Sequence, residues 1–120
     1  MSEVYEWSTF LELRGFYARW EGCGCTDRDL RDFQLELAAD PLRWPVVPTA
    51  GGWRKARFVP PSWKKGKSGG LRVYFAILSG HGTFLLATPF RKSVMDDLPA
   101  NEKRTMAAIL ARIRQRYEGG

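Results

Sequence analysis

The sequence predicts an α+β domain with an N-terminal helical hairpin, an antiparallel twisted sheet of three to four strands and a C-terminal helix. Two patterns predict this class. Near both ends of the chain apolar residues recur at steps of three and four, and between residues 53 and 88 they follow the alternation of strands. A length of 120 residues suits a single domain, residues 1–120, with one hydrophobic core.

Three segments have the spacing of amphipathic helices. Residues 9–20 begin with a capping-box pattern, and residues 26–39 end shortly before Pro41, because the residue preceding a proline disfavours the helical region. A glycine-rich turn at residues 22–24 joins these two helices into a hairpin. The third helix is expected over residues 99–117.

Three further segments are predicted to form strands. Residues 53–59 alternate between two sides, and residues 71–78 and 83–88 are rich in aromatic and β-branched or other apolar residues. Residues 79–82 have the composition of a hairpin turn between the last two strands. Residues 4–6 are a further candidate for an edge strand.

The most unusual feature of the composition is a segment of 55 residues, 41–95, that contains no acidic residue. Its ten basic residues give it a charge of +10, while the flanks together carry −4, in agreement with the net charge of +6. A soluble surface normally mixes both signs, so this separation predicts a face that binds a polyanion such as nucleic acid. The ten residues are Arg43, Arg54, Lys55, Arg57, Lys64, Lys65, Lys67, Arg72, Arg91 and Lys92.

Other classes of protein are disfavoured. No run of residues approaches the roughly 18 apolar residues that cross a bilayer, and no secretory signal is visible, so the expected location is the cytoplasm. Cys23 and Cys25 lack the further ligands that a zinc site needs, and His81 is the only histidine. Neither a metal nor another cofactor is expected, and the two thiols are expected to be reduced.

The predicted strands bring several basic residues together. Lys55 and Arg57 are two residues apart on one strand and point to the same side, about 6–7 Å apart, while Arg72 lies on the next strand. Such cations suit RNA cleavage, in which a ribose 2′-hydroxyl attacks the adjacent phosphate with help from a base, an acid and positive charge. Lysine becomes a base when like charge lowers its pKa, and arginine clamps phosphate with two donors.

Two motifs in this basic region resemble the RelE/HigB family of toxins from bacterial type II toxin–antitoxin modules. They are Gly-Gly-Trp-Arg-Lys-Ala-Arg-Phe at residues 51–58 and Gly-Lys-Ser-Gly-Gly-Leu-Arg-Val at residues 66–73. The resemblance implies a RelE-like fold and a metal-independent endoribonuclease that cleaves mRNA at the ribosome and thereby inhibits translation. It also implies a helix-turn-helix antitoxin as the partner in a hetero-oligomer.

The resemblance also implies roles for individual residues. Lys55 would act as the base or as a phosphate contact, Arg57 and Arg72 would stabilise the transition state, and Lys92 or Arg91 would support the phosphate or the leaving group. Some family members have a tyrosine after the last basic residue, but residues 93–98 contain none, so the general acid is not assigned. The residues expected to contact RNA outside the catalytic set are Arg54, Lys64, Lys65, Lys67, Arg91 and Trp63.

Two questions stay open on sequence alone. Trp63 can stack on a base or pack back against the domain. A toxin of the same fold can also inhibit gyrase, as ParE-like toxins do, and a non-catalytic nucleic-acid-binding protein is a third reading. The combination of Lys55, Arg57, Arg72 and Lys92 favours the nuclease, because inhibition of gyrase needs no group of residues that cleaves phosphate esters.

Overall fold

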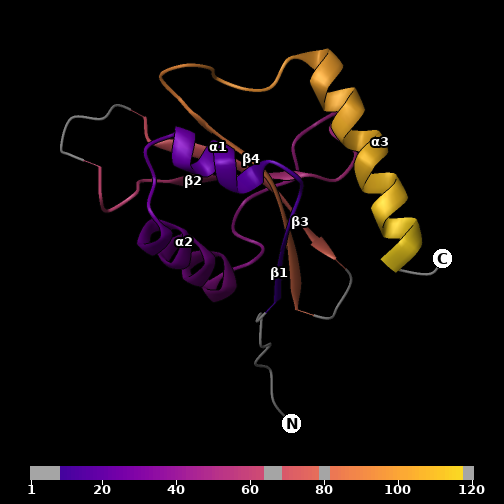
Figure 1. Ribbon diagram of the computed structural model, residues 1–120. Helices are drawn as coiled ribbons and strands as arrows, with labels where there is room; N and C mark the ends of the chain where they lie inside the picture. The colour runs from indigo at the N-terminus through magenta and orange to yellow at the C-terminus, as the bar shows by residue number, and fades with distance from the viewer. Residues whose placement is uncertain (1–8, 64–68, 79–81, 118–120) are drawn as a thin grey trace, which may run out of the picture.

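The computed structural model describes residues 9–63, 69–78 and 82–117, which form a three-layered α+β domain (Figure 1). A four-stranded sheet in the order β1-β4-β3-β2 lies between α1 and α2 on one side and α3 on the other. The α+β class and the C-terminal helix are therefore confirmed. The elements in chain order are β1 (Thr9–Glu12), α1 (Phe16–Gly22), α2 (Asp27–Ala39), β2 (Arg54–Phe58), β3 (Leu71–Leu78), β4 (Thr83–Arg91) and α3 (Ala100–Tyr117).

The sheet is mixed, so the prediction of a purely antiparallel sheet is wrong. β3 pairs in antiparallel fashion with both β2 and β4, but β1 runs parallel to β4, with Thr9 opposite Thr83. β4 continues to Arg91, beyond its expected end at residue 88. Opposite the step from Tyr74 to Phe75, β4 carries an additional residue, Ala87, which makes a β-bulge.

The first predicted helix is wrong in its first half, because residues 9–12 form β1. Phe10 stacks on Phe84 on one side of the sheet, with 5.1 Å between ring centroids, while Leu11 packs on the other side. Gly15 then adopts a φ of 85°, which only glycine tolerates easily, and α1 begins after it. The short apolar pattern fits both periods, and pairing with the edge of β4 decides for the strand. The edge strand expected at residues 4–6 lies outside the described residues.

The helical hairpin itself is present, with a short first helix and a well-capped second one. The Thr26 hydroxyl accepts a hydrogen bond from the Asp29 N–H at 3.0 Å, and the Asp29 carboxylate accepts one from the Thr26 N–H at 2.9 Å. This capping box fixes the start of α2 where the sequence predicts it. In the turn before it, Cys23 and Cys25 are free thiols, as expected. Burial, with the charges of Cys23 and Asp29, raises the pKa of Cys25 to about 12, so this thiol is unreactive at neutral pH.

The two sides of the sheet bury separate apolar clusters, which define two faces used below. The α1–α2 face packs Phe16, Trp20 and Phe33 against alternate residues of the strands, and the α3 face packs Trp53 and Leu110. The alternation predicted for residues 71–78 is confirmed, because successive residues enter different clusters. None of the described helices is long and apolar enough to cross a membrane.

Candidate functional site

The four residues assigned to catalysis, Lys55, Arg57, Arg72 and Lys92, come together at one end of the sheet. In the antiparallel ladder Lys55 stands opposite Tyr74, and Arg57 stands opposite Arg72. The side chains of these two pairs therefore project on the α3 face. Lys92 directly follows β4, where its N–H donates to the carbonyl of Gly70 at 3.1 Å. We call Lys55, Arg57, Arg72 and Lys92 the cation cluster.

Arg57 and Arg72 place two guanidinium groups on neighbouring strands. Arg57 is exposed, whereas Arg72 is only 8% exposed and its Nη1 donates to the Gly69 carbonyl at 2.6 Å. Burial, followed by the positive charge of Arg57, lowers the pKa of Arg72. Like charges directly opposite each other in a sheet repel, so this pair gains most from an anion placed between them.

The segment without acidic residues acquires two carboxylates in three dimensions, because Asp96 and Asp97 fold back onto it. Asp97 accepts a hydrogen bond from the Tyr74 hydroxyl at 2.5 Å, and it lies 3.3 Å from Lys55 Nζ and 2.9 Å from Lys103 Nζ. Burial alone would raise the pKa of Asp97. Lys103, Tyr74, the Leu98 N–H and Lys55 outweigh that effect and lower the pKa to about 2. Asp97 is therefore ionised at neutral pH and holds β2 and α3 together.

Asp96 is the exposed neighbour of Asp97. Its carboxylate lies 2.6 Å from Lys92 Nζ, and the hydrogen bond and charge of Lys92 are the main reasons that its pKa is lowered. The charges of Lys55 and Arg72 lower the same pKa further. Three members of the cation cluster thus act electrostatically on one carboxylate, and one of them, Lys92, contacts it directly.

Tyr74 lies beneath this group and is fully buried. Burial, the hydrogen bond to Asp97 and the charge of Asp97 raise the pKa of Tyr74 far above its usual value, so the phenol stays protonated. Sequence reasoning missed Tyr74, Asp96, Asp97 and Lys103. For Tyr74 a signal existed, since it lies two residues after Arg72 and therefore on the same side of β3.

The other described residues that were predicted to contact RNA lie outside the cation cluster, and their side chains contact the protein itself. Arg91 belongs to the α1–α2 face, where its Nε and Nη2 donate to the Cys23 carbonyl at 3.1 and 2.8 Å, and its guanidinium stacks 4.7 Å from the centroid of the Trp63 ring. Trp63 Nε1 donates to the Gly24 carbonyl at 3.2 Å, so Trp63 packs back against the domain. Arg54 donates to the Trp44 carbonyl at 2.6 Å. The predicted contacts that lie outside the described residues are Lys64, Lys65 and Lys67.

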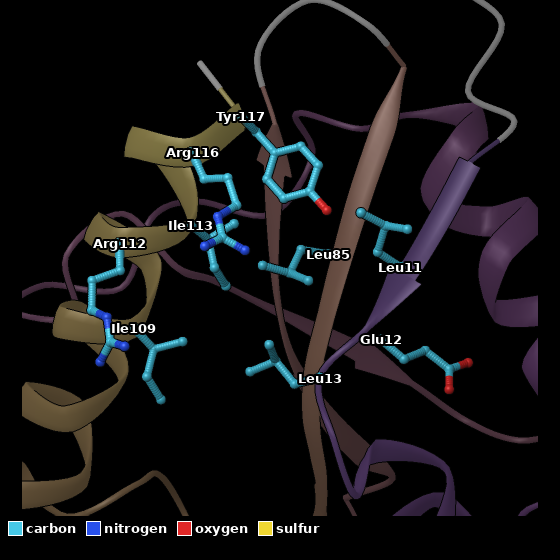
Figure 2. A pocket seen from close by; sticks show the side chains of 9 residues that line it. All are labelled: Leu11, Glu12, Leu13, Leu85, Ile109, Arg112, Ile113, Arg116 and Tyr117. Carbon is cyan, nitrogen blue, oxygen red and sulfur yellow. The ribbon is translucent and has the colours of Figure 1, made fainter. Parts of the chain in front are cut away.

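A separate groove of about 580 Å³ lies between β1 and α3 (Figure 2). Leucines of β1 and β4 and isoleucines of α3 form its apolar wall, and two arginines and a tyrosine of α3 stand along it. Glu12 borders this groove, but its side chain extends away from α3 (Figure 2). The lining residues are Leu11, Glu12, Leu13, Leu85, Ile109, Arg112, Ile113, Arg116 and Tyr117.

The chemistry available at the cation cluster is that of lysine, arginine and carboxylate groups. Within residues 9–63, 69–78 and 82–117, no group of three or more His, Cys, Asp or Glu side chains could hold a metal ion. No protein-family model matches the chain.

Proposed function

We propose that the protein is a RelE-type toxin that cleaves mRNA on the ribosome through attack of a ribose 2′-hydroxyl, without a metal ion. The observation that carries this proposal is the convergence of Lys55, Arg57, Arg72 and Lys92 at one end of the sheet. The resemblance of residues 51–58 and 66–73 to RelE/HigB toxins supports it, because these motifs supply three of the four cations. The α+β class of the fold agrees with the same family.

In this proposal Arg57 and Arg72 bind the scissile phosphate. The phosphate gains negative charge when the 2′-hydroxyl attacks, and fixed donors stabilise that charge without having to reorient. Arg72 meets this requirement because the Gly69 carbonyl already holds it in place. Lys55 forms an ion pair with Asp97, and an ion pair favours the charged form of lysine. A general base must be deprotonated, so a phosphate contact is the better role for Lys55.

Proton transfer is then left to Asp96 and Lys92. Asp96 is exposed and, as a carboxylate whose pKa is not raised, is ionised at neutral pH, so its oxygen can accept the proton of the 2′-hydroxyl. The O2′–P bond forms, the P–O5′ bond breaks, and the leaving O5′ takes a proton from Lys92. The products are an RNA that ends in a 2′,3′-cyclic phosphate and an RNA that begins with a 5′-hydroxyl.

The partner in this proposal is an antitoxin whose neutralising segment occupies the groove between β1 and α3. That groove combines an apolar wall with Arg112 and Arg116, so it suits a segment that carries both apolar and acidic residues (Figure 2). Replacing both arginines by glutamate should prevent co-purification of the antitoxin. The control variant Arg104→Glu, at an exposed position of the same helix, should still co-purify with it. Unchanged co-purification of the double variant would exclude this docking site.

The test of the enzyme is an incubation with mRNA on programmed ribosomes, followed by mapping of the cuts. The wild-type protein should cut and leave cyclic-phosphate ends. Asp96→Asn should lower the rate on the order of 10²–10⁴-fold, as is typical for loss of a general base, and Arg104→Ala should have no effect. Growth arrest by the wild-type protein without any cut in the mRNA would exclude the proposed nuclease activity. Inhibition of DNA supercoiling would then favour a gyrase inhibitor.

A further inference from the structure

A second groove, of about 550 Å³, opens beside Arg57 and Arg72 near β2, the outermost strand of the sheet at that side. Its volume lies in the range of roughly 300–1,000 Å³ that is usual for small-ligand sites. It joins the cation cluster to residues of α2 and of the loop that follows α2, none of which the proposed chemistry uses. The lining residues are Glu36, Arg43, Trp44, Arg57, Phe58, Val59, Gly69, Gly70 and Arg72.

Arg43 and Trp44 form a stack within this groove. The guanidinium carbon of Arg43 lies 4.5 Å from the centroid of the Trp44 ring. Trp44 is half-buried against the core beneath α2, and its carbonyl accepts a hydrogen bond from Arg54 at 2.6 Å. Trp44 is therefore a fixed support, and Arg43 is its exposed outer layer. A planar guanidinium held over an aromatic ring is a surface on which a nucleobase stacks.

Glu36 adds a carboxylate to the same groove. Its side chain is exposed and makes no hydrogen bond or ion pair with any other residue in the described part of the chain. A carboxylate only accepts hydrogen bonds, so it favours a base with an exocyclic amino group, such as cytosine, and disfavours uracil, which has carbonyl oxygens in those places. The groove thus has a stacking surface, a base-selective acceptor and, at Arg57 and Arg72, a phosphate site.

We propose that this groove binds a nucleotide of single-stranded RNA that adjoins the scissile phosphate. The base stacks on Arg43 above Trp44, Glu36 accepts from its amino group, and Arg57 and Arg72 hold its phosphate. The inference rests on the proposed function for the identity of that phosphate. It adds a preference for one kind of base, which the cation cluster cannot provide. It also replaces Trp63 as the stacking residue, because Trp63 is covered by Arg91.

The first experiment maps cut sites on ribosome-bound mRNA for wild type, Glu36→Gln and Arg43→Lys. Wild type should prefer amino-bearing bases at one position beside the cut. Glu36→Gln should raise cutting at uracil relative to cytosine by about tenfold, because an amide can also donate to a carbonyl. Arg43→Lys keeps the charge but loses the plane, and should lower the rate about tenfold with an unchanged melting temperature. An unaltered base profile and an unaltered rate would overturn the subsite, and Arg104→Lys is the matched control.

The second experiment needs no ribosome and separates the subsite from the nuclease. Cytidine 3′-monophosphate, uridine 3′-monophosphate and ribose 5-phosphate are titrated while the indole N–H signal of Trp44 is followed by NMR, with Trp44→Phe used for assignment. The cytidine nucleotide should shift the signal at the lowest concentration and the sugar phosphate should leave it unmoved. A shift without any cleavage of mRNA would retain the subsite and reject the nuclease. Cleavage by a protein whose Trp44 signal ignores every nucleotide would reject the subsite and retain the nuclease.

Discussion

The two faces of the sheet carry the same kinds of basic residue but use them in different ways. On the α1–α2 face, Arg54 and Arg91 direct their donors at backbone carbonyls of Trp44 and Cys23. On the α3 face, Arg57 is exposed and Lys92 is paired with the exposed carboxylate of Asp96. The first set holds loops to the sheet, and the second set is available to a ligand. For these four side chains, donors that the protein itself satisfies thus mark a structural role, while Arg72 combines both roles because its Nη1 donates to the Gly69 carbonyl within the cation cluster.

The largest expected difference between the two faces is in the rate of cleavage. Arg72→Ala should lower the single-turnover rate on programmed ribosomes on the order of 10²–10³-fold, because it removes a fixed donor to the transition state. Arg91→Ala should leave the rate of the folded protein unchanged, because its donors are used by Cys23. Circular dichroism of both variants controls for unfolding. Equal losses in the two variants would show that the faces do not differ in function.

The second expected effect is on stability, and here the α1–α2 face is the one affected. Arg91→Ala removes two hydrogen bonds to a carbonyl and a stack on Trp63, so it should lower the free energy of unfolding by about 1–3 kcal/mol. Urea unfolding followed by fluorescence measures this change. A variant as stable as wild type would mean that the hydrogen bonds of Arg91 hold nothing in place.

The third effect depends on pH and reports on Asp97. Its pKa is about 2 in the folded protein and 3.8 ordinarily, so its contribution to stability is full above the ordinary value and is lost as the pH falls toward 2. The free energy of unfolding of wild type should therefore exceed that of Asp97→Asn at pH 6, and the difference should shrink between about pH 4 and pH 2. A difference that stays constant over this range would contradict the ion pairs with Lys55 and Lys103.

The smallest expected effect is a change in stability on the α3 face. Arg57→Gln removes an exposed cation that faces Arg72, so it relieves repulsion and breaks no hydrogen bond within the described residues. The free energy of unfolding should stay within about 0.5 kcal/mol of wild type, while cleavage falls sharply. A clear loss of stability would show that Arg57 has a structural role like that of Arg91.

Much of the fold follows from local patterns, and the failures have physical causes. The capping box of Thr26 and Asp29 and the alternation along β2 and β3 are local signals that specify those elements. In contrast, residues 9–12 are compatible with a helix or a strand, and only the distant edge of β4 selects the strand. Sequence periodicity cannot include a partner that is more than 70 residues away.

The positions of the candidate residues, as distinct from their roles, were predictable only where they depend on alternation within a strand of known extent. Lys55, Arg57 and Arg72 share a face because they occupy matching positions on β2 and β3. Arg91 was misplaced because β4 continues through it, which turns its side chain to the opposite face from Phe90. The contact of Asp97 with Tyr74 depends on how residues 92–99 return to the sheet, and no repeat in the sequence encodes that path.

The carboxylate of Asp97 has a consequence for communication across the molecule. One of its oxygens holds Lys55 of β2, and the other holds Lys103 in the first turn of α3. A ligand that breaks the ion pair between Lys55 and Asp97 therefore changes the ion pair between Asp97 and Lys103 of α3. In the same way, a partner that displaces α3 changes the charge around Lys55. Thermodynamic reciprocity makes these two couplings equal in free energy. The Asp97 carboxylate is thus a physical link between the cation cluster and the helix that lines the groove beside β1.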